Sequence, residues 1–227
     1  MYSMPNWSSP VSTAFASLKG SELWSSAVTA EIGVETGSMI PPSHPFVGDD
    51  ANRTRAGIHG HGLAMDERIY QIFDTASLLG RPPAITITDK SGLQGIVYWV
   101  QCYLAETVAE RTEIAVKKTE LVDIAKWVDY QYDELGRTTG ISDDEMTGQA
   151  LIHVPDAFVP AYVNKEYGLK GEARVSADDC APIIGWLRDE KVRLREEAGG
   201  RRGTPISGVA QAAMQGLVAQ HLPQVIA

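Results

Sequence analysis

The chain has 227 residues, of which 44% are hydrophobic and 22% charged, the balance of a globular protein that can bury a core. Its net charge of −9 excludes a general nucleic-acid binder, which would carry a basic face, and disfavours binding to anionic lipid. The start has no secretory signal, and no apolar run approaches the roughly 18 residues of a membrane span. The two cysteines have no metal-type spacing, so we expect a reduced, cytoplasmic protein with no nucleic-acid or membrane partner.

The first elements in chain order are an arm, a helix and a stiff connector. Residues 1–20 are rich in Ser, Pro and Ala and show weak periodicity, which is typical of a poorly ordered start. Residues 21–36 place apolar side chains on one helical face after Ser21, a suitable N-cap. The prolines of MIPPSHPFVGDD (39–50) then exclude a helix interior and predict an extended connector.

Between residues 65 and 110 the pattern predicts a helix, a strand and a second helix. MDERIYQIFDTASLLG is typical of a short helix, and Tyr70 lies on the apolar face where we expect it to pack. The β-branched stretch AITIT (84–88) predicts one short strand. The apolar stretch after it predicts a helix over 91–110, with Ser91 as a candidate N-cap.

The rest of the chain is predicted to be helical apart from one segment, 156–175, which we expect to be irregular. The segments with helical periodicity are 120–135, 138–154, 175–200 and 206–222. Ser142 and Glu145 match a capping box, and Pro182 is expected to break the third helix near its start. The predicted fold class is mostly α, with a short strand or two and no TIM barrel, because no alternating βα pattern is present.

Two helical units are similar in sequence. Each has I-x-x-W, a basic turn, T-x-I-S, and a helix that ends in H-x-P; the copies start at Ile124 and Ile183. The spacings differ, so a duplication with insertions and two unrelated amphipathic helix pairs both fit the pattern. Apolar helix faces that carry Trp24, Trp99 and Trp127 predict an interface, and hence a homo- or hetero-oligomer.

Residues 53–62, RTRAGIHGHG, carry the side chains best suited to chemistry. His59 and His61 would lie on one face of a strand, which is how some metal sites begin, but a catalytic zinc needs three protein ligands. The glycines allow close approach of a ligand, and Arg53 and Arg55 suit a carboxylate or phosphate. From composition alone, a flexible surface turn, an anion site and a metal site all remain open.

The surroundings of this stretch resemble a known family. The features I-P-P-x-x-P-F-V-G, T-R-A-G-I-H, DERIYQIFD and TDKSGLQGI are similar to the region just after the catalytic barrel of the alkylmalate synthases. These are the 2-isopropylmalate, homocitrate and Re-type citrate synthases. The resemblance covers about residues 27–155 and continues through IAKWVDYQYDELGRTTGISDDEM in the manner of the Re-citrate and homocitrate branch.

The resemblance implies roles for individual residues. In the family a TIM barrel holds a divalent metal and the 2-oxo acid, and acetyl-CoA is the co-substrate. The A-G-I-H loop reaches into the active site, so the resemblance implies that His59 is catalytic. It further implies substrate binding by Arg53, Arg55, His61 and Ser91, although N-capping remains an alternative role for Ser91. The family usually has an acid where this chain has His61.

The barrel itself has no counterpart in the 227 residues. We therefore expect the divalent metal on a partner barrel subunit, with no metal site here. The resemblance implies an accessory subunit of a two-component acetyl-CoA:2-oxo acid condensing synthase, inactive alone. The alternative is a non-catalytic regulatory or assembly subunit of a full-length synthase.

The expected organisation has four parts. An N-terminal arm (1–26) precedes a synthase linker-like region that carries the A-G-I-H loop (27–105). A helical subdomain (106–155) follows, and then a helical extension (156–227) that could repeat residues 120–155.

Overall fold

The computed structural model describes residues 41–44, 48, 50–70, 75–76, 82–105, 109–114, 116–197 and 207–226. The chain divides into two compact units, Met1–Arg53 with Gln71–Pro83, and Thr54–Tyr70 with Ala84–Ala227. The helix expected over 21–36, together with Trp24, lies outside the described residues. Among the described residues, no helix has the length and apolar character needed to cross a bilayer.

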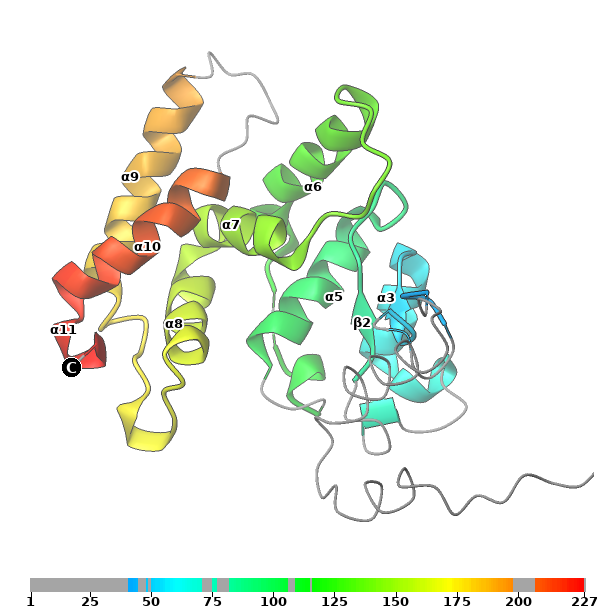
Figure 1. Cartoon of the computed structure of the whole chain (residues 1–227), viewed down its shortest axis with the longest axis horizontal. Helices are drawn as coiled ribbons and strands as arrows, with labels where there is room; N and C mark the ends of the chain where they lie inside the picture. Colours follow the sequence, from blue (N-terminus) through cyan, green and yellow to red (C-terminus); the bar gives the residue numbers. More distant parts are fainter. Residues whose placement is uncertain are drawn as a thin grey trace, which may run out of the picture. The chain divides into compact units, whose positions relative to one another are not determined.

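The second unit is built almost entirely of helices (Figure 1). Its longer helices are α3 (Gly57–Met65), α5 (Gly92–Leu104), α6 (Lys118–Asp133), α7 (Asp143–His153), α8 (Pro155–Glu166), α9 (Ala181–Glu197) and α10 (Ser207–His221). The shorter elements are η2 (Glu67–Ile69), β2 (Ala84–Ile85), η3 (Ala109–Thr112), η4 (Gly171–Ala173) and α11 (Pro223–Ile226). The mostly α fold class is thus confirmed, and the part of the chain that the structure describes contains no barrel.

The strand prediction for 84–88 is also confirmed. β2 pairs with β1 (Arg53–Thr54), and the Thr86 amide donates to the Thr54 carbonyl oxygen at 2.8 Å. On its other side Ile87 forms an antiparallel bridge with Ile141, whose amide donates to the Ile87 carbonyl oxygen at 2.9 Å. This short segment therefore connects the chain just before α3 to the chain just before α7.

Helix α7 lies at the centre of the helical part, with α6, α8, α9 and α10 packed around it (Figure 1). Every residue from Met146 to His153 is buried, including the polar Thr147 and Gln149. Its N-terminus has the predicted capping box: Ser142 Oγ accepts from the Glu145 amide, and the Glu145 carboxylate accepts from the Ser142 amide. Arg137 donates twice to the same carboxylate at 2.7 Å and, with the cap, lowers the pKa of Glu145 to about 2.

Two predictions for the C-terminal half were wrong. Residues 156–175 are not irregular, because α8 covers most of the first part and η4 follows it. Pro155 at the first position of α8 suits a helix start, and burial of Phe158 and Val163 outweighs the cost of Pro160 inside the helix. Pro182 does not break α9, because it lies in the first turn, where its missing N–H is not needed.

The helix expected over 91–110 is shorter than predicted, because α5 ends at Leu104. Of the helix expected over 65–80, Glu67–Ile69 form the 3-10 turn η2 and residues 75–76 are helical, and residues 71–74 and 77–81 lie outside the described residues.

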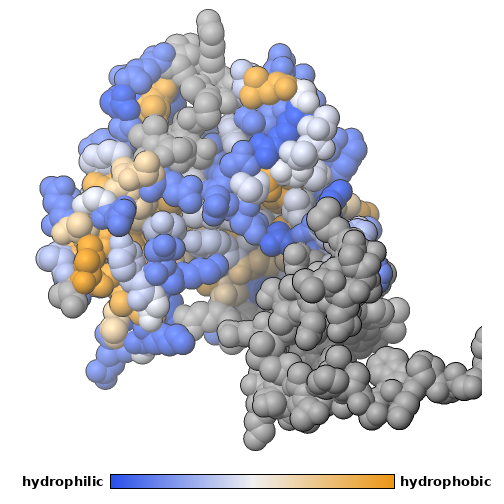
Figure 2. All heavy atoms as spheres, in the orientation of Figure 1, coloured by the Kyte–Doolittle hydropathy of each residue, from blue (hydrophilic) through white to orange (hydrophobic). Residues whose placement is uncertain are grey.

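Two of the three tryptophans predicted to form an interface lie inside the second unit instead, and Trp24 lies outside the described residues. Trp99 and Trp127 are buried, and Trp99 stacks on Phe158 with ring centroids 5.8 Å apart. The coloured surface in Figure 2 is mainly hydrophilic, with hydrophobic side chains in separate spots. The apolar faces of these helices therefore form the core of this unit, and the oligomer remains a prediction without support from these residues.

His153 is buried at a position that disfavours its protonated form. Its side chain is 5% exposed at the end of α7, and its Nδ1 lies 3.8 Å from the Asp123 carboxylate, beyond hydrogen-bond distance. Burial, together with the nearby cations Lys191 and Arg195, lowers the pKa of His153 to about 3. The unfolded chain therefore takes up a proton near the ordinary histidine pKa, which the folded chain does not.

We expect the free energy of unfolding to fall by about 2 kcal/mol between pH 7.5 and pH 5 because of His153. The sign follows from the lowered folded pKa: the contribution is complete above about pH 6.5 and is lost as pH falls. Urea titrations at both pH values would measure it. His153→Leu should abolish most of the difference and His221→Gln should retain it; an unchanged pH dependence in His153→Leu would contradict the assignment.

Candidate functional site

The stretch around His59 and His61 is a helix rather than a loop or strand. Helix α3 runs from Gly57 to Met65 and contains both histidines, which are exposed. Two side chains at positions i and i+2 of an α-helix are separated by about 200° around its axis. The imidazoles therefore project from different sides, and the strand geometry on which the metal interpretation depended is absent.

The inner face of α3 packs closely on α5 through residues without side chains. Gly57 and Gly60 lie against α5 and the turn before it; a Cβ on Gly57 would be 1.9 Å from the Ser91 carbonyl oxygen, and one on Gly60 would be 3.6 Å from the Gly95 Cα. The Gly57 amide donates to the Lys90 carbonyl oxygen at 3.0 Å. The glycines thus let two backbones meet, which is why a segment of poor helix propensity is helical here.

Ser91 holds the start of this site in place. Its hydroxyl donates to the Arg55 carbonyl oxygen at 2.7 Å and accepts from the Thr88 amide at 2.9 Å, and the residue is 1% exposed. Ser91 is the N-cap residue of α5, as predicted, but its side chain makes no cap hydrogen bond to that helix. Its predicted role in substrate binding stays a prediction; the contacts place its hydroxyl in the junction between the chain before α3 and the turn before α5.

His59 is oriented by two neighbours on the outer side of α3. Its Nδ1 forms a 3.1 Å hydrogen bond with Thr54 Oγ1, and its ring centroid lies 4.6 Å from that of Tyr70. Among the described residues no hydrogen bond is made by Nε2, the other ring nitrogen. The arrangement therefore fixes one ring nitrogen against the protein, while the other makes no hydrogen bond to a described residue.

Tyr70 was predicted to pack in a helix face, but it is 49% exposed. It follows η2, and its ring lies so close to α3 that a Cβ on Gly62 would be 2.6 Å from Tyr70 Cε2. Sequence reasoning missed this residue as a member of the site because it treated 65–80 as one helix. The available signal was the glycine at 62, where a bare backbone admits an aromatic ring.

The outer surface of α3 is apolar as well as polar. Ile58, His61 and Met65 share one stripe at i, i+3 and i+7, and Ile58 and Met65 are 74% and 70% exposed. Ile69 in η2 is 55% exposed. Exposed apolar side chains gathered around two histidines are typical of a surface that meets another protein surface or segment.

Comparison with known proteins finds synthases that are similar in sequence to part of this chain. Citrate (Re)-synthase of Syntrophus aciditrophicus is 40% identical over 123 residues, 53% of this chain and 19% of the relative. Citrate (Re)-synthase of Clostridium kluyveri is 41% identical over 107 residues, 47% of this chain and 23% of the relative. A 2-isopropylmalate synthase of Thermus thermophilus is 40% identical over 55 residues, 24% of this chain and 16% of the relative.

About half of the chain is similar in sequence to enzymes of the alkylmalate and citrate synthase family. The chain spans about a fifth of the length of these curated relatives. No family model matches the chain, and no solved structure matches it.

The two arginines that the synthase resemblance assigns to substrate lie in different units. Arg53 belongs to the first unit and forms an ion pair with Asp50, with 3.5 Å between Nε and Oδ1. Arg55 belongs to the second unit and is exposed, and its backbone carbonyl accepts the Ser91 hydroxyl. Arg55 is therefore tied to the start of α3 through its backbone, and both substrate-binding roles stay predictions.

A metal centre of the kind used by the synthase family would need several ligands in one place. In the part of the chain that the structure describes, no three His, Cys, Asp or Glu side chains are placed to hold a metal ion. We therefore derive no chemical step through a metal on these residues.

Proposed function

We propose that this chain is an accessory subunit of a two-component synthase that condenses acetyl-CoA with a 2-oxo acid. A partner barrel would hold the divalent metal and the 2-oxo acid, and α3 would enter its active site. The observation that carries the proposal is the outer face of α3, where His59 is oriented by Thr54 and Tyr70 and leaves Nε2 available. The product would be a 2-alkylmalate or a citrate- or homocitrate-like acid.

The contribution of His59 would be hydrogen bonding or proton transfer at the acetyl thioester. Condensation requires loss of a proton from the thioester methyl group, and negative charge then develops on the thioester oxygen. An imidazole with one nitrogen held by Thr54 Oγ1 presents the other in a defined direction, as a positioned acid or base requires. The apolar stripe of Ile58 and Met65 would exclude water once it is covered by the barrel.

A second function is a regulatory or assembly subunit that docks on a full-length synthase. It is favoured by His61, which stands where the family usually carries an acid and lies on the exposed stripe of α3. In that case the α3 surface would bind another subunit without taking part in the reaction.

The experiment measures CoA release with a thiol reagent, using acetyl-CoA, a divalent metal and several 2-oxo acids. We expect the purified chain alone to show no turnover, and its mixture with a barrel protein from the same source to exceed about 1 per second. Turnover by the isolated chain would overturn the two-component proposal. A complex that forms with a full-length synthase and changes only that enzyme's existing rate would favour the regulatory function.

A further inference from the structure

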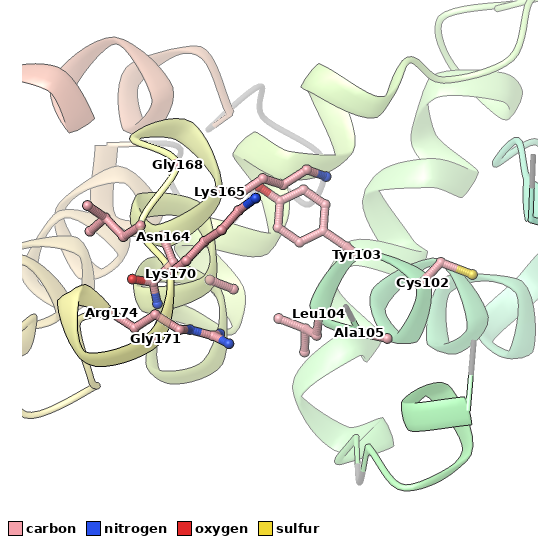
Figure 3. A pocket seen from close by; sticks show the side chains of 12 residues that line it. Cys102, Tyr103, Leu104, Ala105, Asn164, Lys165, Gly168, Lys170, Gly171 and Arg174 are labelled. Atoms are coloured by element: carbon pink, nitrogen blue, oxygen red, sulfur yellow. The ribbon is translucent and has the colours of Figure 1, made fainter. Parts of the chain in front are cut away.

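A pocket of about 740 Å³ lies between the C-terminal end of α5 and the segment from α8 to η4 (Figure 3). Tyr103 and Leu104 of α5 form one side. Lys165, Lys170 and Arg174 form the other, and Figure 3 shows their side chains extending toward α5. A pocket of this volume is in the range of small-molecule sites, about 300–1,000 Å³.

The charge of the pocket is opposite to that of the chain. Lys165, Lys170 and Arg174 line it, and none of the described lining residues is Asp or Glu, whereas the chain as a whole has a net charge of −9. Within the described residues Lys165 and Lys170 make no ion pair, and Lys165 instead lies 4.5 Å above the ring of Tyr103. Many other cations of this unit do pair with a carboxylate, as Arg188 does with Asp156. The two lysines without an ion pair in the described part of the chain therefore favour an anion in this pocket.

The segment that carries the cations is held in shape by the fold. Helix α8 ends in a Schellman motif, in which the Leu169 amide donates to the Asn164 carbonyl oxygen at 2.8 Å and Gly168 has a φ of +63°. The buried Asn164 side chain donates to the Val175 carbonyl oxygen at 3.0 Å and accepts from the Val175 amide at 2.8 Å. These bonds close the loop at both ends, so residues from 165 to 174 return to the same side of α8.

The other lining side chains indicate which kind of anion the pocket suits. Leu104 and Leu169 supply apolar surface beside the cations. Tyr103 stacks on Trp99 with centroids 5.5 Å apart, and its hydroxyl is hydrogen-bonded to the Thr147 side chain. Burial raises the pKa of the phenol to about 12, so the ring is neutral at physiological pH. Lysine and arginine side chains suit phosphate, and the two lysines without an ion pair among the described residues favour a ligand with more than one negative charge.

We propose that this pocket binds an organic phosphate, a ligand with a phosphate or pyrophosphate group and an apolar or aromatic body. The phosphate oxygens would lie among Lys165, Lys170 and Arg174, and the body would lie against Leu104 and Leu169. The assignment does not depend on condensing activity or on α3. It concerns the isolated chain, so its failure and the failure of the proposed function are separate results.

The test is isothermal titration calorimetry of the full chain with ADP, coenzyme A, inorganic pyrophosphate, citrate and adenosine at low salt. We expect ADP or coenzyme A to bind more tightly than pyrophosphate, and citrate and adenosine to bind at least about 10-fold more weakly. A preference for ADP assigns a free nucleotide, and a preference for coenzyme A assigns a thioester carrier; either supports the proposal. No binding of ADP, coenzyme A or pyrophosphate at millimolar concentration, or equal binding of citrate or adenosine, would overturn it.

Matched variants locate the binding. Lys165→Gln combined with Lys170→Gln should weaken ADP binding by about 10-fold or more, because two charged hydrogen-bond donors are lost. Lys118→Gln removes one charge from an exposed lysine on α6 that does not line the pocket, and it should leave binding within about 2-fold. Both proteins should show the wild-type far-UV circular dichroism spectrum. Equal loss of affinity in the control, or no loss in the double variant, would refute the site.

Discussion

His59→Ala should lower turnover of the reconstituted two-component synthase by about 100-fold or more, the usual scale for a positioned acid or base. The physical reason is that one imidazole nitrogen is held by Thr54 Oγ1 while the other is left for the substrate. Stability should hardly change, because the ring is exposed and makes its contacts at the surface with Thr54 and Tyr70. Steady-state kinetics beside a thermal melt would measure both quantities.

His61→Ala is the matched control, because it removes an exposed imidazole from the same helix about 200° away. We expect a smaller effect on rate and a change in the preference among 2-oxo acids. If His59→Ala retains full turnover while its melting temperature falls, the histidine is structural and the regulatory function is supported instead.

Gly57→Ala should destabilise the second unit by about 3 kcal/mol, the upper range for overpacking a tight site. The added Cβ would lie 1.9 Å from the Ser91 carbonyl oxygen, and that atom is backbone, so α3 and the turn before α5 must move apart. The hydrogen bond from the Gly57 amide to the Lys90 carbonyl oxygen would lengthen with them. Urea denaturation followed by circular dichroism would measure the loss.

Two glycines elsewhere provide the opposite control. Gly185 in α9 and Gly216 in α10 have open space where a Cβ would be placed. Gly185→Ala and Gly216→Ala should therefore stabilise the chain by about 0.5–1 kcal/mol each, through helix propensity alone. A Gly57→Ala variant as stable as these two would show that α3 does not pack on α5 as described.

Local patterns were sufficient for the elements whose cause is local. The capping box of Ser142 and Glu145, the strand over 84–88 and the long helices α6 and α10 were all predicted from neighbouring residues. These elements depend on hydrogen bonds between nearby residues and on burial of one face. Both can be recognised from residue types at short, regular spacings in the sequence.

The incorrect predictions concern segments whose structure depends on distant partners. Helix α3 contains glycines at 57, 60 and 62, which favour a loop by propensity, yet α5 and Tyr70 require bare backbone at these positions. Pro160 favoured an irregular segment, but α8 forms because its apolar residues are buried. In both cases tertiary packing overrides propensity.

The candidate site was predicted only in part, because its contacts also join residues that are distant in the sequence. The family motif identified His59, while its neighbours Thr54 and Tyr70 are five and eleven positions away, one before α3 and one after it, and contact the imidazole only in the folded chain. The position of Ser91 at the N-cap of α5 was predicted, but the bond of its hydroxyl across 36 positions to the Arg55 carbonyl oxygen was not. Single-sequence patterns do not record such contacts.

The burial of α7 on all sides has a consequence for how this chain can be divided or shortened. Helices α9 and α10, near the C-terminus, pack directly on α7, which precedes them by more than 25 positions. A chain cut after Pro155 would expose Met146, Leu151 and Ile152 to water, the kind of surface that aggregates. Helices α9 and α10 therefore cannot be removed without exposing the apolar surface of α7. A shortened or divided chain must retain both helices or supply other residues that bury this surface.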